Sequence, residues 1–223
     1  MGWRELVMLR FAEELLLLTL DDENGRFARV PDRLMRYALA GGVLMDLALE
    51  NRIDTDLKNL ILVDSTPLQD SLLDPTLADI AQADDTRDAR FWVERTALRA
   101  DTIREVALNR LVEQGILKRE EDRFMWVFQA RRYPIIDNTA EREVKLRIME
   151  VLFSDQIPGP RDVVIIGLAH ACDIFKEILS ARELARVSDR IDQVRKLDLI
   201  GQAMSQAITD IELSLALAVQ MMP

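Results

Sequence analysis

The stretch LMRYALAGGVLMDLALEN, residues 34–51, decides the fold. Apolar residues occur on nearly every side of a helix with this sequence, so we expect the helix to be buried all round. It opens at Pro31, because proline is tolerated in the first turn of a helix. A glycine inside a helix costs about 1 kcal/mol relative to alanine. We therefore expect Gly41 and Gly42 to serve the close approach of another backbone.

Helical patterns flank this stretch on both sides, and two short β patterns interrupt them. Helices are predicted over residues 5–20, 75–82, 91–117 with a break near 99–101, 141–153, 163–179, 182–199 and 203–222. Two short strands are predicted within residues 52–64, and a β-hairpin over 117–132. The sequence therefore predicts a mostly α fold, a single compact domain over residues 1–223, in which amphipathic helices ring apolar central helices.

The composition is typical of a globular chain with a helical bias. Hydrophobic residues make up 49% and charged residues 30% of the 223 residues, while aromatic residues make up only 5%. The net charge of −10 argues against nucleic-acid binding over the whole surface, because such binding needs basic residues to replace counterions. A local basic patch is compatible with this charge and would orient the protein on an anionic surface.

Cysteine usage and hydropathy indicate the cytoplasm. A single cysteine cannot form an internal disulfide, which suits a reducing compartment. The first residues, MGWRELVMLR, lack a signal-peptide core. The longest apolar runs, such as LLLLTL at residues 15–20, are far shorter than the ~20 residues that span a bilayer. We expect a cytoplasmic protein that meets a membrane only at its surface.

No motif in the sequence indicates catalysis or metal binding. The single histidine and the single cysteine, His170 and Cys172, lie in GLAHACDIFKEIL, residues 167–179. A two-residue step turns a helical side chain by about 200°, so the two residues point to opposite sides and cannot hold a metal together. Their apolar neighbours favour core or near-core positions. Phosphate-binding glycine motifs, GxSxG and HExxH are absent too, so we expect no enzyme, no cofactor and no metal.

Aromatic residues mark the predicted hairpin. In ILKREEDRFMWVFQARRY, residues 116–133, Phe124, Trp126 and Phe128 alternate with other apolar residues, so both faces of the second strand are apolar. Such a strand is covered on both sides or lies at an interface. A helix followed by a two-stranded wing is also the outline of a winged-helix DNA-binding element. The preceding helix carries as many acids as arginines and would read phosphates poorly, so nucleic acid is not the expected partner.

Two groups of arginines stand out: Arg29, Arg33 and Arg36 near the second helix, and Arg95, Arg99 and Arg104 further on. Guanidinium groups match phosphate oxygens through two parallel hydrogen bonds. If the fold brings the two groups together, they form a headgroup pocket on an otherwise acidic protein. The alternative is that each arginine pairs with a neighbouring acid on a solvated face.

The order of these segments resembles the Golgi phosphoprotein 3 family. The resemblance covers about residues 6–199 and rests on FAEELLLLTLDDENGRF, AGGVLMDLALENRI, LLDPTLADI, IREVALNRLVEQGIL and GLAHACDIFKEIL. Eukaryotic members of this family are peripheral membrane proteins that bind phosphatidylinositol 4-phosphate and hold glycosyltransferases in the Golgi. The resemblance implies a mostly helical fold, and it implies that the 117–132 hairpin is an oligomerisation element.

The resemblance implies a lipid site that this chain keeps only in part. The eukaryotic pocket uses a tryptophan before the second helix, an arginine within that helix, and two arginines three residues apart on the helix before the hairpin. By alignment these positions hold, in chain order, Val30-Pro31, Ala40, Asp101 and Arg104. Arg33, Arg36 and Arg99 lie close enough in the sequence to replace the lost charge. These departures favour a prokaryotic relative.

The leading hypothesis is a non-enzymatic peripheral membrane protein on the cytosolic face of a membrane. It would bind an anionic phospholipid headgroup, by resemblance phosphatidylinositol 4-phosphate, through Arg104 with Arg33, Arg36 and Arg99. It would form a homo-oligomer through the hairpin and engage client proteins. The alternatives are a protein-interaction adaptor of the same fold that binds no lipid and, third, a winged-helix regulator.

Overall fold

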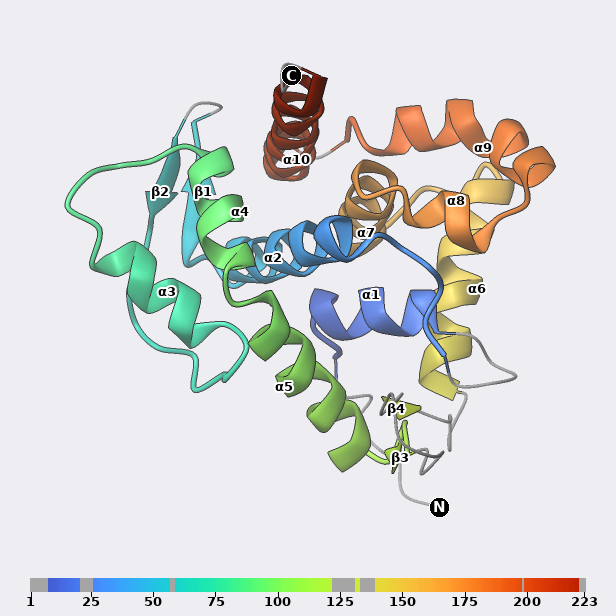
Figure 1. The fold of residues 1–223 in the computed structure, drawn as a ribbon, viewed down its shortest axis with the longest axis horizontal. Coiled ribbons are helices and arrows are strands. Elements are labelled where there is room, and N and C mark those ends of the chain that lie inside the picture. Colours follow the sequence, from blue (N-terminus) through green and yellow to red (C-terminus); the bar gives the residue numbers. More distant parts are fainter. Residues whose placement is uncertain are drawn as a thin grey trace.

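Helices make up nearly all of the regular structure. The structure, a computed structural model, describes residues 8–20, 26–56, 59–121, 131–132, 139–197 and 199–220. Its elements are α1 (Phe11–Thr19), α2 (Asp32–Leu49), β1 (Ile53–Thr55), β2 (Leu60–Leu62), α3 (Asp74–Ala81), α4 (Ala89–Ala97), α5 (Ala100–Glu113), β3 (Glu120–Glu121), β4 (Arg131–Arg132), α6 (Thr139–Phe153), α7 (Pro160–Ala171), α8 (Ile174–Ile178), α9 (Ala181–Val194) and α10 (Leu199–Gln220). Figure 1 shows α1 and α2 at the centre with the other helices around them.

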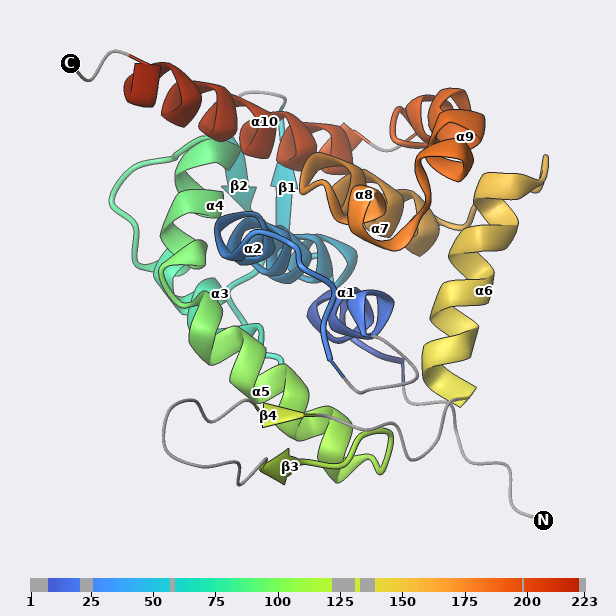
Figure 2. The same cartoon turned by 45° about the vertical axis from the view of Figure 1, so that its right-hand side comes forward.

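The stretch at residues 34–51 forms most of α2, which lies at the centre of the molecule (Figures 1 and 2). Helix α1 packs against it, and every residue of α1 is buried. A Cβ atom on Gly42 would lie 3.2 Å from the Cβ of Phe11 and 3.3 Å from the backbone nitrogen of Ala12. The expected close approach of a second backbone is therefore confirmed at Gly42.

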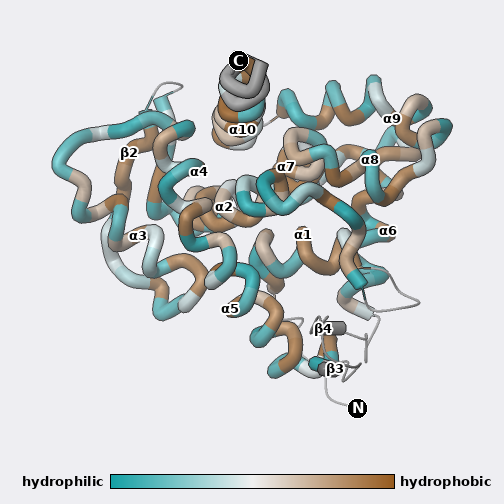
Figure 3. Tube along the Cα trace, in the orientation of Figure 1, coloured by the Kyte–Doolittle hydropathy of each residue, from teal (hydrophilic) through white to brown (hydrophobic). Residues whose placement is uncertain are grey.

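The remaining helices surround this pair. Helix α5 packs on α1 and α2, α6 on α1, α7 on both, and α4 and α10 on α2 and on each other. Hydrophilic residues gather along outer helices such as α9 (Figure 3), whose buried side chains, Val187, Ile191 and Val194, recur at helical spacing. The buried side chains form one continuous apolar cluster. The predicted mostly α fold, with apolar central helices inside amphipathic ones, is confirmed.

Two long helical predictions are interrupted in the structure. Residues 91–117 divide into α4 and α5, and the predicted break near residue 99 is confirmed. Residues 163–179, predicted as one helix, divide into α7 and α8. That prediction is wrong because Asp173 has a left-handed backbone conformation, with φ of 56°, which a right-handed helix cannot continue through.

The single histidine and cysteine lie at this second break. Cys172 is fully buried, as predicted, and burial raises the pKa of its thiol far above the ordinary value. His170 is exposed near the end of α7, so the prediction of a core or near-core position is wrong for this residue. The last turn of α7 faces solvent on the His170 side.

Two short antiparallel hairpins complete the fold. The two predicted strands form β1 and β2, with Ile53 opposite Leu62. Strands β3 and β4 pair at the base of the predicted 117–132 hairpin. Its aromatic residues, Phe124, Trp126 and Phe128, lie outside the described residues, so their role in oligomerisation stays a prediction.

Charged side chains lie within the core around the N-terminal end of α1. Glu13, Glu14 and Asp46 are buried. The two glutamates belong to the helix predicted over residues 5–20, and that prediction rests on the apolar residues of the segment. Arginines reach these three carboxylates from the segment before α1 and from α5, α6 and α7. We call the following set the buried charge cluster: Arg10, Glu13, Glu14, Asp46, Asp70, Arg110, Arg147, Arg161 and Asp162. Pairing each carboxylate with a cation makes this burial tolerable.

Asp46 is the most constrained carboxylate of the cluster. One oxygen accepts a hydrogen bond from the backbone N–H of Phe11 at 2.8 Å. The other lies 3.5 Å from Nη1 of Arg161 and 4.0 Å from Nη1 of Arg10. Burial nevertheless raises the pKa of Asp46 to about 7, because removing the carboxylate from water outweighs these favourable contacts. Asp46 therefore joins α2 to the start of α1 through a group that titrates near neutral pH.

Candidate functional site: two arginine sites at the start of α2

Three of the predicted arginines, Arg33, Arg36 and Arg104, lie at two places around the loop before α2 and the helices α2, α4, α5 and α10. Figures 1 and 2 show how these elements are arranged. The first, the Phe27 site, consists of Phe27, Arg29 and Arg104. The second, the α2–α4–α10 pocket, is lined by Arg33, Arg36, Tyr37, Arg90, Glu94, Ala97, Leu98, Ile211 and Ser214.

At the Phe27 site, Arg104 of α5 lies against an aromatic ring. Its guanidinium carbon is 4.9 Å from the centre of the Phe27 ring, which is a cation–π geometry. The loop is held in place because the backbone N–H of Ala28 donates to the carbonyl of Thr19 at 2.7 Å. No ion pair joins Arg104 to a carboxylate among the residues that the structure describes. The ring therefore positions a guanidinium whose N–H donors are open to another oxyanion.

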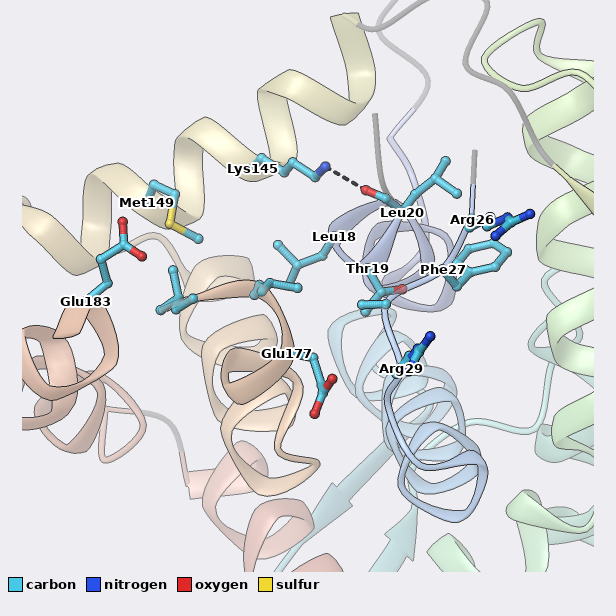
Figure 4. Close-up of a pocket in the computed structure, with 13 residues that line it drawn as sticks. Leu18, Thr19, Leu20, Arg26, Phe27, Arg29, Lys145, Met149, Glu177 and Glu183 are labelled. Atoms are coloured by element: carbon cyan, nitrogen blue, oxygen red, sulfur yellow. Dashed lines mark hydrogen bonds between the residues drawn. The ribbon is translucent and has the colours of Figure 1, made fainter. Parts of the chain in front are cut away.

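A cavity of about 890 Å³ opens beside this site (Figure 4). Arg26 and Arg29 reach it from the loop before α2, and Lys145 of α6 donates a hydrogen bond to the carbonyl of Leu20 at 2.7 Å. Glu183 lies at the opposite end of the view from Phe27. The wall of the cavity also includes these residues: Leu18, Met149, Glu177, Ile178 and Leu179. Arg26 and Arg29 thus bring positive charge to the Phe27 end of a cavity whose walls are both apolar and charged.

Arg36 links the two sites. Its Nε donates to Asp32 at 2.8 Å, and its Nη2 donates to Asp101 at 2.7 Å. Asp101 lies one turn before Arg104 on α5, at a position where the resemblance implies an arginine. Arg36 therefore neutralises the acid that would otherwise repel an anion beside Arg104.

Arg33 and Arg36 meet a third arginine in the α2–α4–α10 pocket, which has a volume of about 400 Å³. Arg33 donates from Nη2 to Glu212 at 2.6 Å. Arg90 donates from Nε to Glu94 at 3.3 Å and from Nη1 to the hydroxyl of Ser214 at 3.2 Å. The pocket is therefore lined by guanidinium groups from α2 and α4, each of which already faces a carboxylate.

Arg99 lies apart from both sites. Its guanidinium points to α3, where Nη1 is 2.9 Å from a carboxylate oxygen of Asp79 and Nη2 donates to the hydroxyl of Thr76 at 3.0 Å. Arg95 faces the same carboxylate at 3.7 Å. The structure thus brings Arg33, Arg36 and Arg104 into one region and directs Arg99 to α3.

Phe27 and Arg90 are among the residues of these sites that sequence reasoning missed. Phe27 follows Asn24-Gly25, a dipeptide typical of turns, but its role depends on Arg104, which is distant in the sequence. Arg90 precedes the predicted helix, whereas Asp88 caps α4 by accepting from the backbone N–H of Phe91 at 2.8 Å. Asp88 was the signal in the sequence that could have placed Arg90 in the helix, because a helix capped by Asp88 begins before Arg90.

Two further observations concern the residues that the structure describes. None of their histidine, cysteine, aspartate and glutamate side chains gather in threes or more at a position suited to a metal ion. Within the same residues, every helix is too short or too polar to cross a bilayer. The chemistry that the two sites do offer is charge pairing and hydrogen bonding by guanidinium groups.

Comparison with known proteins relates the chain to one family. The family model described as Golgi phosphoprotein 3 (GPP34) matches residues 11–211. The chain is similar to vacuolar protein sorting-associated protein 74 of Eremothecium gossypii, with 24% identity over 207 residues, which are 77% of this chain and 62% of that protein. It is also similar to the protein of the same name from Schizosaccharomyces pombe, with 28% identity over 166 residues, 66% of this chain and 49% of that protein. Both relatives are fungal, so the expectation of a prokaryotic source stays a prediction.

Proposed function

Because the chain belongs to the Golgi phosphoprotein 3 family, we propose that it is a non-enzymatic peripheral membrane protein that binds an anionic phospholipid headgroup at the Phe27 site. The observation that carries this proposal is Arg104, positioned on the Phe27 ring with no carboxylate partner among the described residues. Phosphatidylinositol 4-phosphate is the first lipid to test, by resemblance to the eukaryotic members. The protein would act on the cytosolic face of its membrane.

The chemistry of the proposed site is phosphate recognition by Arg104. Its guanidinium would present two parallel N–H donors to the phosphate, and Phe27 would hold the plane of the guanidinium in place. A hydrogen bond to a charged group contributes about 1.5–3 kcal/mol. Arg29 is exposed in the loop before α2 and adds positive charge. Arg36 supports the site indirectly, because it neutralises Asp101.

The proposed affinity of one site is modest. Ala40, at the position of the family's helix arginine, is fully buried, so no side chain from there reaches a headgroup. Arg99 is held by α3, and we leave it out of the proposed site. Several weak sites on one oligomer would bind a membrane through avidity. We therefore include homo-oligomerisation through the 117–132 hairpin in the proposal.

The alternative is a protein-interaction adaptor of the same fold that binds no lipid. One observation favours it: the cavity of about 890 Å³ beside Phe27 has both apolar and charged walls, which suits a short segment of a client protein. The chain spans about half to three-fifths of the length of the relatives it matches. Activities and partners of a whole relative are therefore proposals for this chain.

Vesicle flotation separates these functions. Phosphatidylcholine vesicles, alone or with phosphatidylinositol 4-phosphate, phosphatidylserine or phosphatidylglycerol, are mixed with the full chain. We expect an anionic lipid to recruit the protein, and Arg104→Gln to lower the bound fraction at least fivefold. Arg87→Gln removes the same charge from an exposed arginine outside both sites, and we expect it to bind normally.

Two results would contradict the lipid proposal. If no anionic lipid recruits the protein, the adaptor function is favoured instead. If the two variants lose binding equally, the attraction comes from overall charge and not from the Phe27 site. A shift of duplex DNA by the protein at low salt would revive the winged-helix alternative.

A further inference from the structure

The α2–α4–α10 pocket differs from the Phe27 site in its balance of charge. Each of its three guanidinium groups faces a carboxylate in the following pairs: Arg33 with Glu212, Arg90 with Glu94, and Arg36 with both Asp32 and Asp101. A purely anionic group in the pocket would meet Glu94, which lines it, at close range, and like charges repel. A ligand that suits the pocket therefore carries both signs of charge.

The pocket retains donors for the negative part of such a ligand. An arginine has five N–H donors. Arg33 uses Nη2 for Glu212, and Arg90 uses Nε and Nη1 for Glu94 and Ser214. The other N–H groups of both side chains have no acceptor among the described residues, and both side chains are partly exposed. An oxyanion can therefore bind without breaking the existing pairs.

An acceptor for the positive part lies beside these donors. Glu94 lines the pocket, and its side chain is 47% exposed. One of its oxygens accepts from Nε of Arg90 at 3.3 Å, so the carboxylate has room for a further donor. Burial raises the pKa of Tyr37, and the charges of Glu212 and Glu94 raise it further, so the Tyr37 hydroxyl stays protonated. An ammonium group would supply Glu94 with donors.

We propose that the α2–α4–α10 pocket binds a zwitterionic phosphoethanolamine headgroup. Its phosphate accepts from the open N–H groups of Arg33 and Arg90, and its ammonium donates to Glu94. A primary ammonium has three N–H donors, whereas the trimethylammonium of phosphocholine has none, so the pocket selects between these two headgroups. The net charge of the site is unchanged by a ligand of this kind.

The rim of the pocket favours a lipid over a free small molecule. Leu98 lines the pocket and is 73% exposed. On α10, which contributes Ser214 to the pocket, Leu213 and Leu217 are 58% and 60% exposed and lie on one face of the helix, four residues apart. Exposed leucines beside a headgroup pocket can enter the acyl boundary of a bilayer. We therefore assign the headgroup to a membrane phospholipid.

Calorimetry with soluble headgroups tests the pocket apart from the proposed anionic-lipid function. The two headgroups are titrated into the full chain as glycerophosphoethanolamine and glycerophosphocholine, which are phosphodiesters without net charge, as in a membrane lipid, and inorganic phosphate is the third ligand. We expect the phosphoethanolamine headgroup to bind at least tenfold more tightly than the other two. Arg90→Gln and Glu94→Gln should each weaken it at least fivefold, whereas Arg87→Gln and Arg104→Gln should leave it unchanged. In flotation, phosphatidylethanolamine should raise the fraction bound to phosphatidylcholine vesicles.

Each other outcome overturns part of the assignment. Equal binding of phosphocholine or of inorganic phosphate contradicts recognition of the ammonium. Unchanged binding by Arg90→Gln contradicts the location, and loss of binding in Arg104→Gln moves the ligand to the Phe27 site. Binding of the soluble headgroup without a preference for phosphatidylethanolamine vesicles contradicts the lipid. Matching thermal unfolding of wild type and variants by circular dichroism confirms that each variant is folded.

Discussion

Arginine–carboxylate pairs occur in two regions of this protein that differ in their access to water. In the buried charge cluster, Glu13, Glu14 and Asp46 are at most 3% exposed. In the α2–α4–α10 pocket, the side chains of Arg33 and Arg90 are 53% and 41% exposed. Helix α2 takes part in both regions, with an arginine near its start and Asp46 near its end.

The difference in burial gives the same chemistry two different roles. In the cluster, water cannot replace a lost partner, so each charge depends on the others and the pairs hold helices together. In the pocket, water competes for every pair, so each contributes little to stability and can exchange for a ligand. Access to water therefore separates a structural arginine from one that we propose as a ligand-binding residue.

Breaking the buried charge cluster should have the greatest effect. Arg161 lies 3.3 Å from Glu14, 3.5 Å from Asp46 and 4.1 Å from the centre of the Phe11 ring. Arg161→Leu leaves two buried carboxylates short of a partner, so we expect the free energy of unfolding to fall by about 3–5 kcal/mol. Arg33→Leu, in the exposed pocket, should lower it by less than about 1 kcal/mol. Urea denaturation of both variants checks this, and equal losses would contradict the comparison.

The pH dependence of stability tests the cluster without a mutation in its arginines. Burial raises the pKa of Asp46 from 3.8 to about 7, so between these values the folded state binds a proton that the unfolded state does not. The resulting stabilisation is lost as pH rises through the folded-state pKa, with a slope of at most about 1.4 kcal/mol per pH unit. We expect the free energy of unfolding, measured by urea denaturation, to fall between pH 5 and pH 8. Asp46→Asn should flatten this fall, and an unchanged slope would exclude Asp46 as its source.

A substitution at Asp101 separates stability from binding in the exposed region. Asp101 is 76% exposed, so Asp101→Asn should change the free energy of unfolding by less than about 1 kcal/mol. It removes a negative charge beside Arg104 and weakens the two hydrogen bonds that Nη2 of Arg36 donates to Asp101. We expect flotation to show about two- to fivefold more protein on anionic vesicles, since about 1 kcal/mol corresponds to this range. Weaker binding would mean that Asp101 positions Arg36 for the headgroup.

A higher salt concentration should produce the smallest change in stability, and it should act on the α2–α4–α10 pocket but not on the buried charge cluster. Raising the ionic strength from about 0.1 M to 1 M shortens the Debye length from about 10 Å to 3 Å. The stability difference between wild type and Arg33→Leu should then shrink, by less than about 0.5 kcal/mol. The effect of Arg161→Leu should stay constant, because its partners are buried. Urea denaturation at both salt concentrations compares the two, and equal salt sensitivity would argue against the contrast in access to water.

Much of the fold could be predicted because it follows from local patterns. The apolar run of residues 34–51 and the proline before it determine α2, and the pattern changes near residue 99 where α4 gives way to α5. The helix over 163–179 could not be divided correctly, because Asp173 adopts a conformation that non-glycine residues rarely take. The two buried glutamates of α1 were missed as well, since their partners lie on other helices.

The candidate sites could be predicted only in part. Arg104 was named from the family resemblance and Arg33 and Arg36 from their nearness in the sequence, and the three do reach one region. Arg99 has the same residue type and lies close in sequence, yet it binds α3 because the chain bends between α4 and α5. Arg90 became part of the pocket through its place beside α10.

Helical periodicity tells which residues face the core, since that depends on a repeat of 3.6 residues within one segment. It sufficed to place α2 at the centre, whereas the resemblance to the family rests on the particular segments and their order along the chain. The partner of each arginine depends on how separate helices pack, and charges that meet across helices are far apart in the chain. Packing therefore surrounds Arg161 with buried carboxylates, whereas Arg104 lies against the Phe27 ring without a carboxylate partner among the described residues. Both are arginines on helices of the same protein.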